Sequence, residues 1–453
     1  MEKAGIAARE LALRVIFSVN ERGAFSDLAT TRALSASPLG RLDRSLVTEL
    51  VSGTVKRRLT LDWALGRWLP RGMAGTPPWA RNILRLAAYQ ILYLDRIPAS
   101  AACDTAVELA KKYAPRTAGL VNAVLRSLAR NGRPDLPPFS ADPVTHLALK
   151  HSHPPWLVQR WLRRWGREWT EALMEAANRP PPLAVRVNTL KREPREVAAE
   201  FKARGQEVRE SGYAPEGLVV EGLSFLEDLP GLQAGHYVFQ DEGSMVVSHA
   251  LSPREQSLTV DACAGLGTKT THLAQLNHNR GDILAVDRQP GRLRLLRRAC
   301  ARLGVTCVRS LAADARRLPD LVDDTPEFVL VDAPCSGLGV LRRRADARWK
   351  KNPRDLAVLP ALQLELLEAA WALLPSGGVL VYSTCTVEPE ENQEVVRELR
   401  DRHPDLVPED LNSHLPRPLP RPEDRQQAAQ GWLQLYPHVH GTDGFFIARL
   451  RKR

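Results

Sequence analysis

The sequence contains no run of about 18 apolar residues, the length that a helix needs to cross a bilayer, so we expect no membrane span. Cysteine is also scarce: six are spread over 453 residues, and none forms a C-x-x-C pair. This pattern argues against a disulfide framework or a structural zinc site, so we predict no bound metal and read each cysteine as buried or catalytic. The first residues mix Glu2, Arg9 and Glu10 with apolar ones. They indicate an amphipathic helix rather than a signal peptide, and we expect a cytoplasmic protein.

Positive charge is concentrated at one end of the chain. The formal net charge is +11, and residues 1–140 alone hold 21 Lys and Arg against 11 Asp and Glu. A basic segment beside a nearly neutral remainder favours a polyanionic partner, most simply nucleic acid, over a merely solvated basic face.

Hydrophobic spacing divides the chain into helical and mixed parts. Residues 82–94, 101–113 and 118–131 have apolar positions at helical spacing, whereas strands and helices alternate regularly from about residue 257. Such alternation implies a doubly wound parallel sheet. The predicted segments are an all-helical one (1–140), a helical linker (141–182), a small α/β subdomain (183–256) and a doubly wound α/β segment (257–453). Within the last, the proline-rich residues 403–430 are expected to form a loop.

One helical stretch, residues 151–178, combines aromatic and basic side chains. Trp161, Trp165 and Trp169 lie four residues apart, with arginines between them. Aromatic rings among arginines can stack RNA bases, but the even spacing favours a packed helix face.

Acidic residues follow three successive predicted strands. Asp261 begins the turn Asp261–Lys269, Asp287 follows 26 residues later, and Asp314 follows the third strand. The glycines of the turn allow close approach of a ligand, and a carboxylate ending the second strand can bind both hydroxyls of a ribose. The turn lacks G-x-G-x-x-G, so a dinucleotide is weakly supported. The pattern favours a nucleoside without phosphate, such as S-adenosyl-L-methionine.

Two further strands end in a cysteine. The fourth strand runs into Asp332-Ala333-Pro334-Cys335, and the fifth into Ser383-Thr384-Cys385. A thiolate that adds to carbon 6 of cytosine makes carbon 5 nucleophilic toward a methyl sulfonium. A neighbouring carboxyl group can engage N3, and a base must later remove the carbon-5 proton. Two cysteines and an aspartate suit these steps, although two buried structural cysteines would give the same pattern.

These motifs resemble those of a known family. The segments DAPCSG and STCT, the DACA turn with its Gly-x-Lys-Thr, and the late GFF strand are similar to RNA 5-methylcytosine methyltransferases of the NOP2/Sun (RsmB/Fmu) group. The likeness covers about residues 183–453, and residues 1–140 resemble a NusB-type RNA-binding domain. It implies a Rossmann-like S-adenosylmethionine-dependent methyltransferase preceded by a small α/β subdomain and an all-α NusB-like domain.

The resemblance also assigns roles to residues. It implies that Cys385 is the nucleophile, that Cys335 assists product release and that Asp332 engages both base and cofactor. The cofactor contacts that it implies are Cys263, Ala264, Gly265, Leu266, Gly267, Thr268, Lys269, Asp287, Asp314 and Asp332. Leu266 and Thr268 depart from the family's usual Pro and Gly, so the turn is expected to approach the methionine moiety differently.

The expected reaction is therefore carbon-5 methylation of a cytosine in 16S ribosomal RNA by a monomer that binds RNA and no membrane. Two alternatives stay open at this point. One is the same chemistry on transfer RNA. The other is a non-catalytic RNA-binding or antitermination protein, which the altered cofactor turn motivates.

Overall fold

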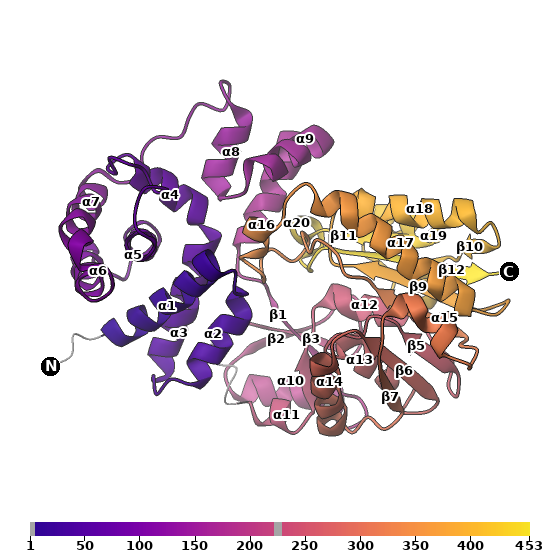
Figure 1. Cartoon of the computed structure of the whole chain (residues 1–453). Helices are drawn as coiled ribbons and strands as arrows, with labels where there is room; N and C mark the ends of the chain where they lie inside the picture. Colours follow the sequence, from indigo (N-terminus) through magenta and orange to yellow (C-terminus); the bar gives the residue numbers. More distant parts are fainter. Residues whose placement is uncertain (1–4, 222–228) are drawn as a thin grey trace. The chain divides into compact units, whose positions relative to one another are not determined.

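The computed structural model describes residues 5–221 and 229–453, which fall into two compact units. The first unit consists of Met1–Arg179 and Leu341–Asn352, and the second of Pro180–Val340 and Pro353–Arg453. Figure 1 colours both along the chain. The fourfold division expected from the sequence differs from these units and stays a prediction.

The first unit is helical throughout its described residues. Its core surrounds α5, a helix that is buried along most of its length and packs against α1, α3, α4, α6 and α7. Pro78 begins α5, where a missing N–H costs nothing. The helices of this unit are α1 (Ile6–Arg22), α2 (Ser26–Ser35), α3 (Arg41–Lys56), α4 (Arg58–Gly66), α5 (Pro78–Tyr93), α6 (Ala99–Tyr113), α7 (Ala118–Asn131), α8 (Pro143–His151), α9 (Pro155–Asn178) and α16 (Ala347–Lys350), with the 3₁₀ turn η1 (Pro115–Thr117).

The helical stretch predicted after His153-Pro154-Pro155 is confirmed as α9, although Gly166 interrupts it with φ 73°. The break falls between Trp165 and Trp169, so the spacing of four does not run along one regular helix across all three rings. Trp161 is fully buried, as expected for packing, and its ring lies near that of His153.

Residues 341–352 belong to the first unit although they follow a strand of the second. Arg348 is fully buried and donates to the backbone oxygens of Ser152 and Ala177 and to Asn178 Oδ1. Trp349 Nε1 donates to the Val55 oxygen at 2.7 Å. The polar contacts of a fully buried arginine thus hold residues 341–352 within the helical unit.

The second unit begins with a small antiparallel sheet. Its strands lie in the order β2-β3-β1-β4, with β1 at Leu183–Val187, β2 at Glu207–Glu210, β3 at Gly217–Glu221 and β4 at Tyr237–Phe239. Val197 and Phe201 of α10 (Pro194–Ala203) pack on this sheet. The short helix α11 (Pro230–Gln233) precedes β4.

The second unit continues as an eight-stranded sheet with the order β10-β12-β9-β8-β5-β6-β7, while β11 pairs with β12. Strands β5 to β9 run parallel, and β12 is antiparallel to β9. The strand order reverses between β5 and β8, the point where doubly wound sheets bind ligands. The strands are β5 (Leu258–Asp261), β6 (Asp282–Asp287), β7 (Val308–Ala312), β8 (Phe328–Asp332), β9 (Val379–Thr384), β10 (Leu406–Pro408), β11 (Trp432–Leu435) and β12 (Phe445–Lys452).

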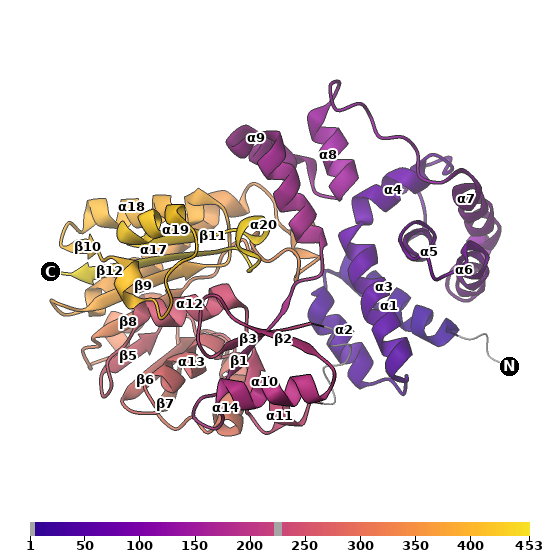
Figure 2. The same ribbon diagram turned by 180° about the vertical axis from the view of Figure 1, so that it is seen from behind.

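Helices cover both faces of this sheet, as Figures 1 and 2 show from opposite sides. Apolar residues of α12, α13 and α14 form a core with one face, and those of α15, α17 and α18 with the other. The prediction of a Rossmann-like doubly wound fold is therefore confirmed. The helices are α12 (Glu242–Leu251), α13 (Thr268–Leu276), α14 (Pro290–Leu303), α15 (Leu318–Leu321), α17 (Asp355–Leu373), α18 (Gln393–Arg402), α19 (Pro422–Ala429) and α20 (Pro437–His440), with 3₁₀ turns η2 (Ala315–Arg317), η3 (Pro389–Glu391) and η4 (Leu411–His414).

Among the described helices, α17 alone has the length and composition that could cross a membrane. Leu364, Leu367 and Ala370 of this helix pack in the sheet core. The proline-rich tail expected as a loop is also structured, which corrects that prediction: β10 pairs with β12, and α19 begins at Pro422.

Candidate functional site

The turn after β5 is shaped by two glycines. Gly265 and Gly267 have φ values of 56° and 85°, a region that L side chains rarely adopt. A Cβ on Gly267 would lie 2.6 Å from Leu296 Cγ. Leu266 between them is about half exposed and directs an apolar side chain to the surface. The turn therefore keeps its tight backbone despite its unusual residues.

Asp287 at the end of β6 holds this turn. Its Oδ2 accepts from the Gly265 N–H at 3.1 Å, and its Oδ1 from the Gln289 N–H at 2.7 Å. Arg292 lies on the Oδ2 side at 3.4 Å. Each carboxylate oxygen has two lone pairs, so capacity for a ligand hydroxyl is left.

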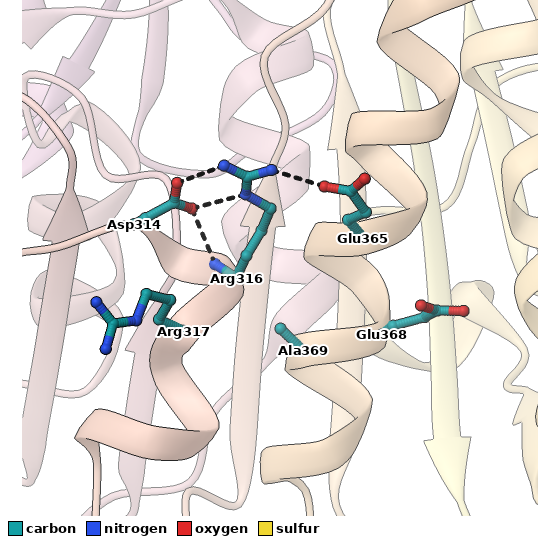
Figure 3. Close-up of a pocket in the computed structure, with 6 residues that line it drawn as sticks. All are labelled: Asp314, Arg316, Arg317, Glu365, Glu368 and Ala369. Carbon is teal, nitrogen blue, oxygen red and sulfur yellow. Dashed lines mark hydrogen bonds and ion pairs between the residues drawn. The ribbon is translucent and has the colours of Figure 1, made fainter.

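Asp314, after β7, lies beside a surface hollow shown in Figure 3. Its carboxylate accepts from the backbone N–H and the guanidinium of Arg316, which also contacts Glu365 of α17. The hydrogen bonds from Arg316 lower the pKa of Asp314 to about 2. In this structure Asp314 is thus committed mainly to Arg316.

Asp332 ends β8 beside β9. Its Oδ2 accepts from Lys269 Nζ at 2.7 Å, and its Oδ1 from Ser383 Oγ at 2.7 Å. The register of the parallel pair places Asp332 opposite Ser383. One carboxylate therefore joins the turn after β5 to the strand that leads to Cys385.

The two cysteines that follow β8 and β9 lie together. Cys335 Sγ and Cys385 Sγ are 3.4 Å apart, and the Cys385 N–H also points to Cys335 Sγ at 3.4 Å. The hydrogen bond with Cys385, followed by burial, raises the pKa of Cys335 well above its usual value. Cys335 is therefore a neutral thiol at pH 7.

A buried triad lies apart from the thiols. Nε2 atoms of His249 and His272 lie 2.9 and 2.7 Å from the same oxygen of Glu216, Oε1. These residue types can bind a divalent cation. In this structure both imidazoles donate a hydrogen bond to the carboxylate, and burial lowers the pKa of His272 to about 3.

Sequence reasoning missed several residues around the thiols. Glu391 and Asn392 are fully buried and hydrogen-bond to the loops that carry the two cysteines. The only signal was a polar run, Glu388–Asn392, shortly after Cys385. Arg186, whose guanidinium donates to the Thr268 oxygen just after the glycine turn, gave no signal within its strand.

Comparison with known proteins extends over the whole chain. Residues 248–451 match the family described as 16S rRNA methyltransferase RsmB/F, residues 6–130 match the NusB family, and residues 153–224 match the RsmF/B-like ferredoxin-like domain.

Individual relatives match at full length. The chain is 36% identical to a probable ribosomal RNA small subunit methyltransferase B of Bacillus subtilis, over 99% of each chain. It is 34% identical to ribosomal RNA small subunit methyltransferase B of Pseudomonas syringae, over 94% of this chain and 96% of that one. The crystal structure of PH0851 is similar with a TM-score of 0.82 and 28% identity, over 99% of this chain and 98% of that one.

Proposed function

The chain belongs to the RsmB/F family of 16S rRNA methyltransferases, and from this premise we propose that it methylates carbon 5 of a cytosine in small-subunit ribosomal RNA. The observation that carries the proposal is the pair of thiols 3.4 Å apart at the ends of adjacent parallel strands, beside Asp332. Carbon 5 becomes nucleophilic when sulfur adds to carbon 6, and the adduct must later be resolved. Two thiols and a carboxylate support this chemistry better than transfer to a nitrogen or oxygen, which needs no covalent adduct.

S-adenosyl-L-methionine is the methyl donor that the site fits. The glycine turn allows close backbone approach, and the carboxylate of Asp287 keeps acceptor capacity at the end of β6. When bound, the donor supplies an electrophilic methyl group on a sulfonium sulfur. The residues that we propose to hold it are Cys263, Ala264, Gly265, Leu266, Gly267, Thr268, Lys269, Asp287, Asp314 and Asp332. Asp314 contacts the adenine in this proposal only with the lone pairs that Arg316 leaves free.

The chain's own groups divide the reaction into two stages. In the first, the Cys385 sulfur forms a bond to carbon 6, and the electron pair of the carbon 5–carbon 6 double bond shifts toward carbon 5 and N3. N3 takes up a proton from solvent as it gains this electron density, and the Asp332 carboxylate accepts a hydrogen bond from the N3–H. In the second, after carbon 5 has taken the methyl group, a base removes the carbon-5 proton. The pair then re-forms the double bond and the carbon 6–sulfur bond breaks.

We assign Cys335 to the second stage. The resemblance to the family gives the attack to Cys385, and the raised pKa of Cys335 agrees with a thiol that keeps its proton. Its sulfur lies next to Cys385 Sγ, where a group that assists departure of that sulfur is needed.

Alanine variants test this assignment on a denaturing gel with 16S rRNA and S-adenosyl-L-methionine. Cys385→Ala should abolish methylation and give no covalent complex, whereas Cys335→Ala should accumulate a protein–RNA adduct. Cys307→Ala, a half-buried cysteine outside the site, should behave like the parent protein. Accumulation of adduct by Cys385→Ala would reverse the two roles.

The RNA target is tested separately. We propose 16S rRNA, bound by a monomer in the cytoplasm with the basic first unit and the small α/β sheet as its RNA contacts. Bisulfite sequencing of ribosomal and transfer RNA, with and without the gene, should show a cytosine protected in 16S rRNA alone. Loss of protection in a transfer RNA would favour the alternative substrate. Failure to bind S-adenosyl-L-methionine at millimolar concentration in calorimetry would favour a non-catalytic RNA-binding protein.

A further inference from the structure

The loop that carries Cys335 is held on both sides of the cysteine. Before it, the Pro334 oxygen accepts from Gln363 Nε2 at 3.0 Å. After it, the Ser336 N–H donates to Glu391 Oε2 at 2.8 Å. Gln363 and Glu391 are both fully buried and hydrogen-bond to each other at 3.0 Å. The loop is therefore fixed by two polar side chains in a site without competing solvent.

The loop that carries Cys385 is held in a similar way by Asn392, together with Gln434, whose Nε2 also donates to the Thr386 oxygen at 3.3 Å. Thr384 Oγ1 donates to Asn392 Oδ1 at 2.6 Å, and Asn392 Nδ2 donates to the Thr386 oxygen at 3.2 Å. Asn392 Nδ2 also donates to Gln434 Oε1 at 2.8 Å. Asn392 is fully buried, so its amide has few alternative partners.

Glu391 and Asn392 are consecutive in the chain, and the two loops also contact each other directly. Ser336 Oγ and Thr386 Oγ1 are 2.8 Å apart, next to the thiol pair. The Tyr382 hydroxyl donates to the Glu391 backbone oxygen at 2.6 Å, which fixes the turn to β9. One short turn thus holds both cysteines at a set separation.

We propose that Glu391 and Asn392 are positioning residues with separate tasks: Asn392 sets Cys385 for attack, and Glu391 sets Cys335 for resolution of the adduct. The inference rests on the proposed function and deepens it. Neither side chain is assigned a contact with RNA or cofactor. Each acts through the backbone and hydroxyl groups beside one thiol.

The geometry gives the direction and size of the effects. Displacement of a reacting group by about 1 Å can slow a step about 100-fold. Asn392→Ala removes the contacts that Asn392 makes with Thr384 and Thr386 on either side of Cys385, so it should slow adduct formation by about that factor. Glu391→Ala removes the acceptor for the Ser336 N–H, so it should slow resolution and let the adduct accumulate.

The test combines these variants in the full-length protein. Each is incubated with 16S rRNA and S-adenosyl-L-methionine, and the amount of protein–RNA adduct is followed over time on denaturing gels. In Cys335→Ala protein the resolution step is already lost. Adding Glu391→Ala there should change the rate of adduct formation by less than about 3-fold, whereas adding Asn392→Ala should lower it about 100-fold. A general loss of packing would slow both alike.

Conservative variants sharpen the assignment. Glu391→Gln keeps an acceptor oxygen and should resolve the adduct at nearly the parent rate. Thr384→Val removes only the hydroxyl that donates to Asn392, and it should slow attack even where Asn392→Ala fails to fold. Glu394→Ala, an exposed residue on the next helix, is the matched control and should leave both steps unchanged.

The outcomes distinguish the separate tasks of Glu391 and Asn392 from the covalent mechanism on which they rest. If Glu391→Ala slows adduct formation in the Cys335→Ala protein as much as Asn392→Ala does, the separate tasks are wrong while the covalent mechanism stands. If Cys335→Ala and all other variants form no adduct although the parent protein methylates RNA, the covalent mechanism itself is overturned, and this inference with it.

Discussion

Arg186 offers a prediction that joins stability to cofactor binding. This side chain on β1 is fully buried, and its guanidinium donates to Gln240 Oε1, the Thr268 oxygen and Thr271 Oγ1 at 2.6 to 3.0 Å. Burial lowers its pKa to about 9 from a usual value above 12, and the charge of Glu216 opposes that fall. This fall already includes the favourable charge of Glu216, so at about 1.4 kcal/mol per pH unit the remaining cost of the buried charge is roughly 4–5 kcal/mol, which the hydrogen bonds of Arg186 offset.

Arg186→Met should therefore destabilise the second unit. It relieves the cost of burying the guanidinium, but it leaves three acceptors without their donor and Glu216 without its countercharge. Removal of one partner from a buried charge pair costs about 3–5 kcal/mol. We expect the lower end, about 3 kcal/mol, because His249 and His272 still donate to Glu216. Since Thr268 lies in the cofactor turn, S-adenosyl-L-methionine should bind about 10-fold more weakly, or about 1.4 kcal/mol.

Hydrogen exchange measured by mass spectrometry over β5 and β6 gives the stability of the second unit, because a chain of two units need not unfold in one step. Calorimetry gives the cofactor affinity. Arg192→Met, at an exposed residue that pairs with Glu196, is the control and should cost less than about 1 kcal/mol. In the double variant Arg186→Met/Glu216→Gln, the second unit should regain about half of the stability that Arg186→Met alone removes. If the double variant instead loses as much stability as the two single variants added together, Arg186 and Glu216 do not stabilise each other and the reasoning is refuted.

Three further predictions follow from single residues. Gly267→Ala should weaken S-adenosyl-L-methionine binding in calorimetry at least about 10-fold more than Gly265→Ala, because only Gly267 lacks space for a Cβ. Burial lowers the pKa of His272 to about 3, so the unfolded chain takes up this proton first as the pH falls. Its stabilising contribution is complete above about pH 6.5 and is lost toward pH 3, and His272→Gln should flatten the decline in unfolding free energy by up to about 1.4 kcal/mol per pH unit. Arg348→Met should lower the stability of the first unit, read by hydrogen exchange over α9, by about 2–4 kcal/mol because three buried oxygens lose their donor.

The parallel strands could be predicted from the sequence because their signal is local. Phe328–Asp332 is a run of four apolar residues ending in a carboxylate, and the structure has β8 over that range. The tail could not be predicted in this way. Proline there reads as a loop signal, yet Pro422 occupies the first turn of α19, where the helix tolerates it. The place of residues 341–352 in the helical unit has no local signal either: basic side chains are mostly exposed in proteins, whereas Arg348 is buried and donates to backbone oxygens of that unit.

In the candidate site too, the sequence predicts the residues that follow a local pattern and not those that contact them from a distance. Strand ends brought Asp332, Cys335 and Cys385 into one prediction, because parallel strands present their carboxyl ends at one edge. The residues that hold them follow no periodicity. Glu391 contacts Ser336 across 55 residues of sequence, and only the folded chain makes that contact visible.

The short distance between the two thiols also bears on which of them keeps its proton. A hydrogen bond between two sulfurs 3.4 Å apart needs one of them to keep its proton. In the mechanism that we propose, Cys335 keeps its proton, in line with its raised pKa, and its S–H then points to Cys385. Such a donor stabilises the negative charge that develops on the neighbouring sulfur when it departs from carbon 6. The hydrogen bond therefore suits the second stage, to which we assign Cys335. Cys335→Ser, which keeps an O–H donor, should accordingly release the adduct faster than Cys335→Ala when the two are compared on denaturing gels, and equal release would contradict this role.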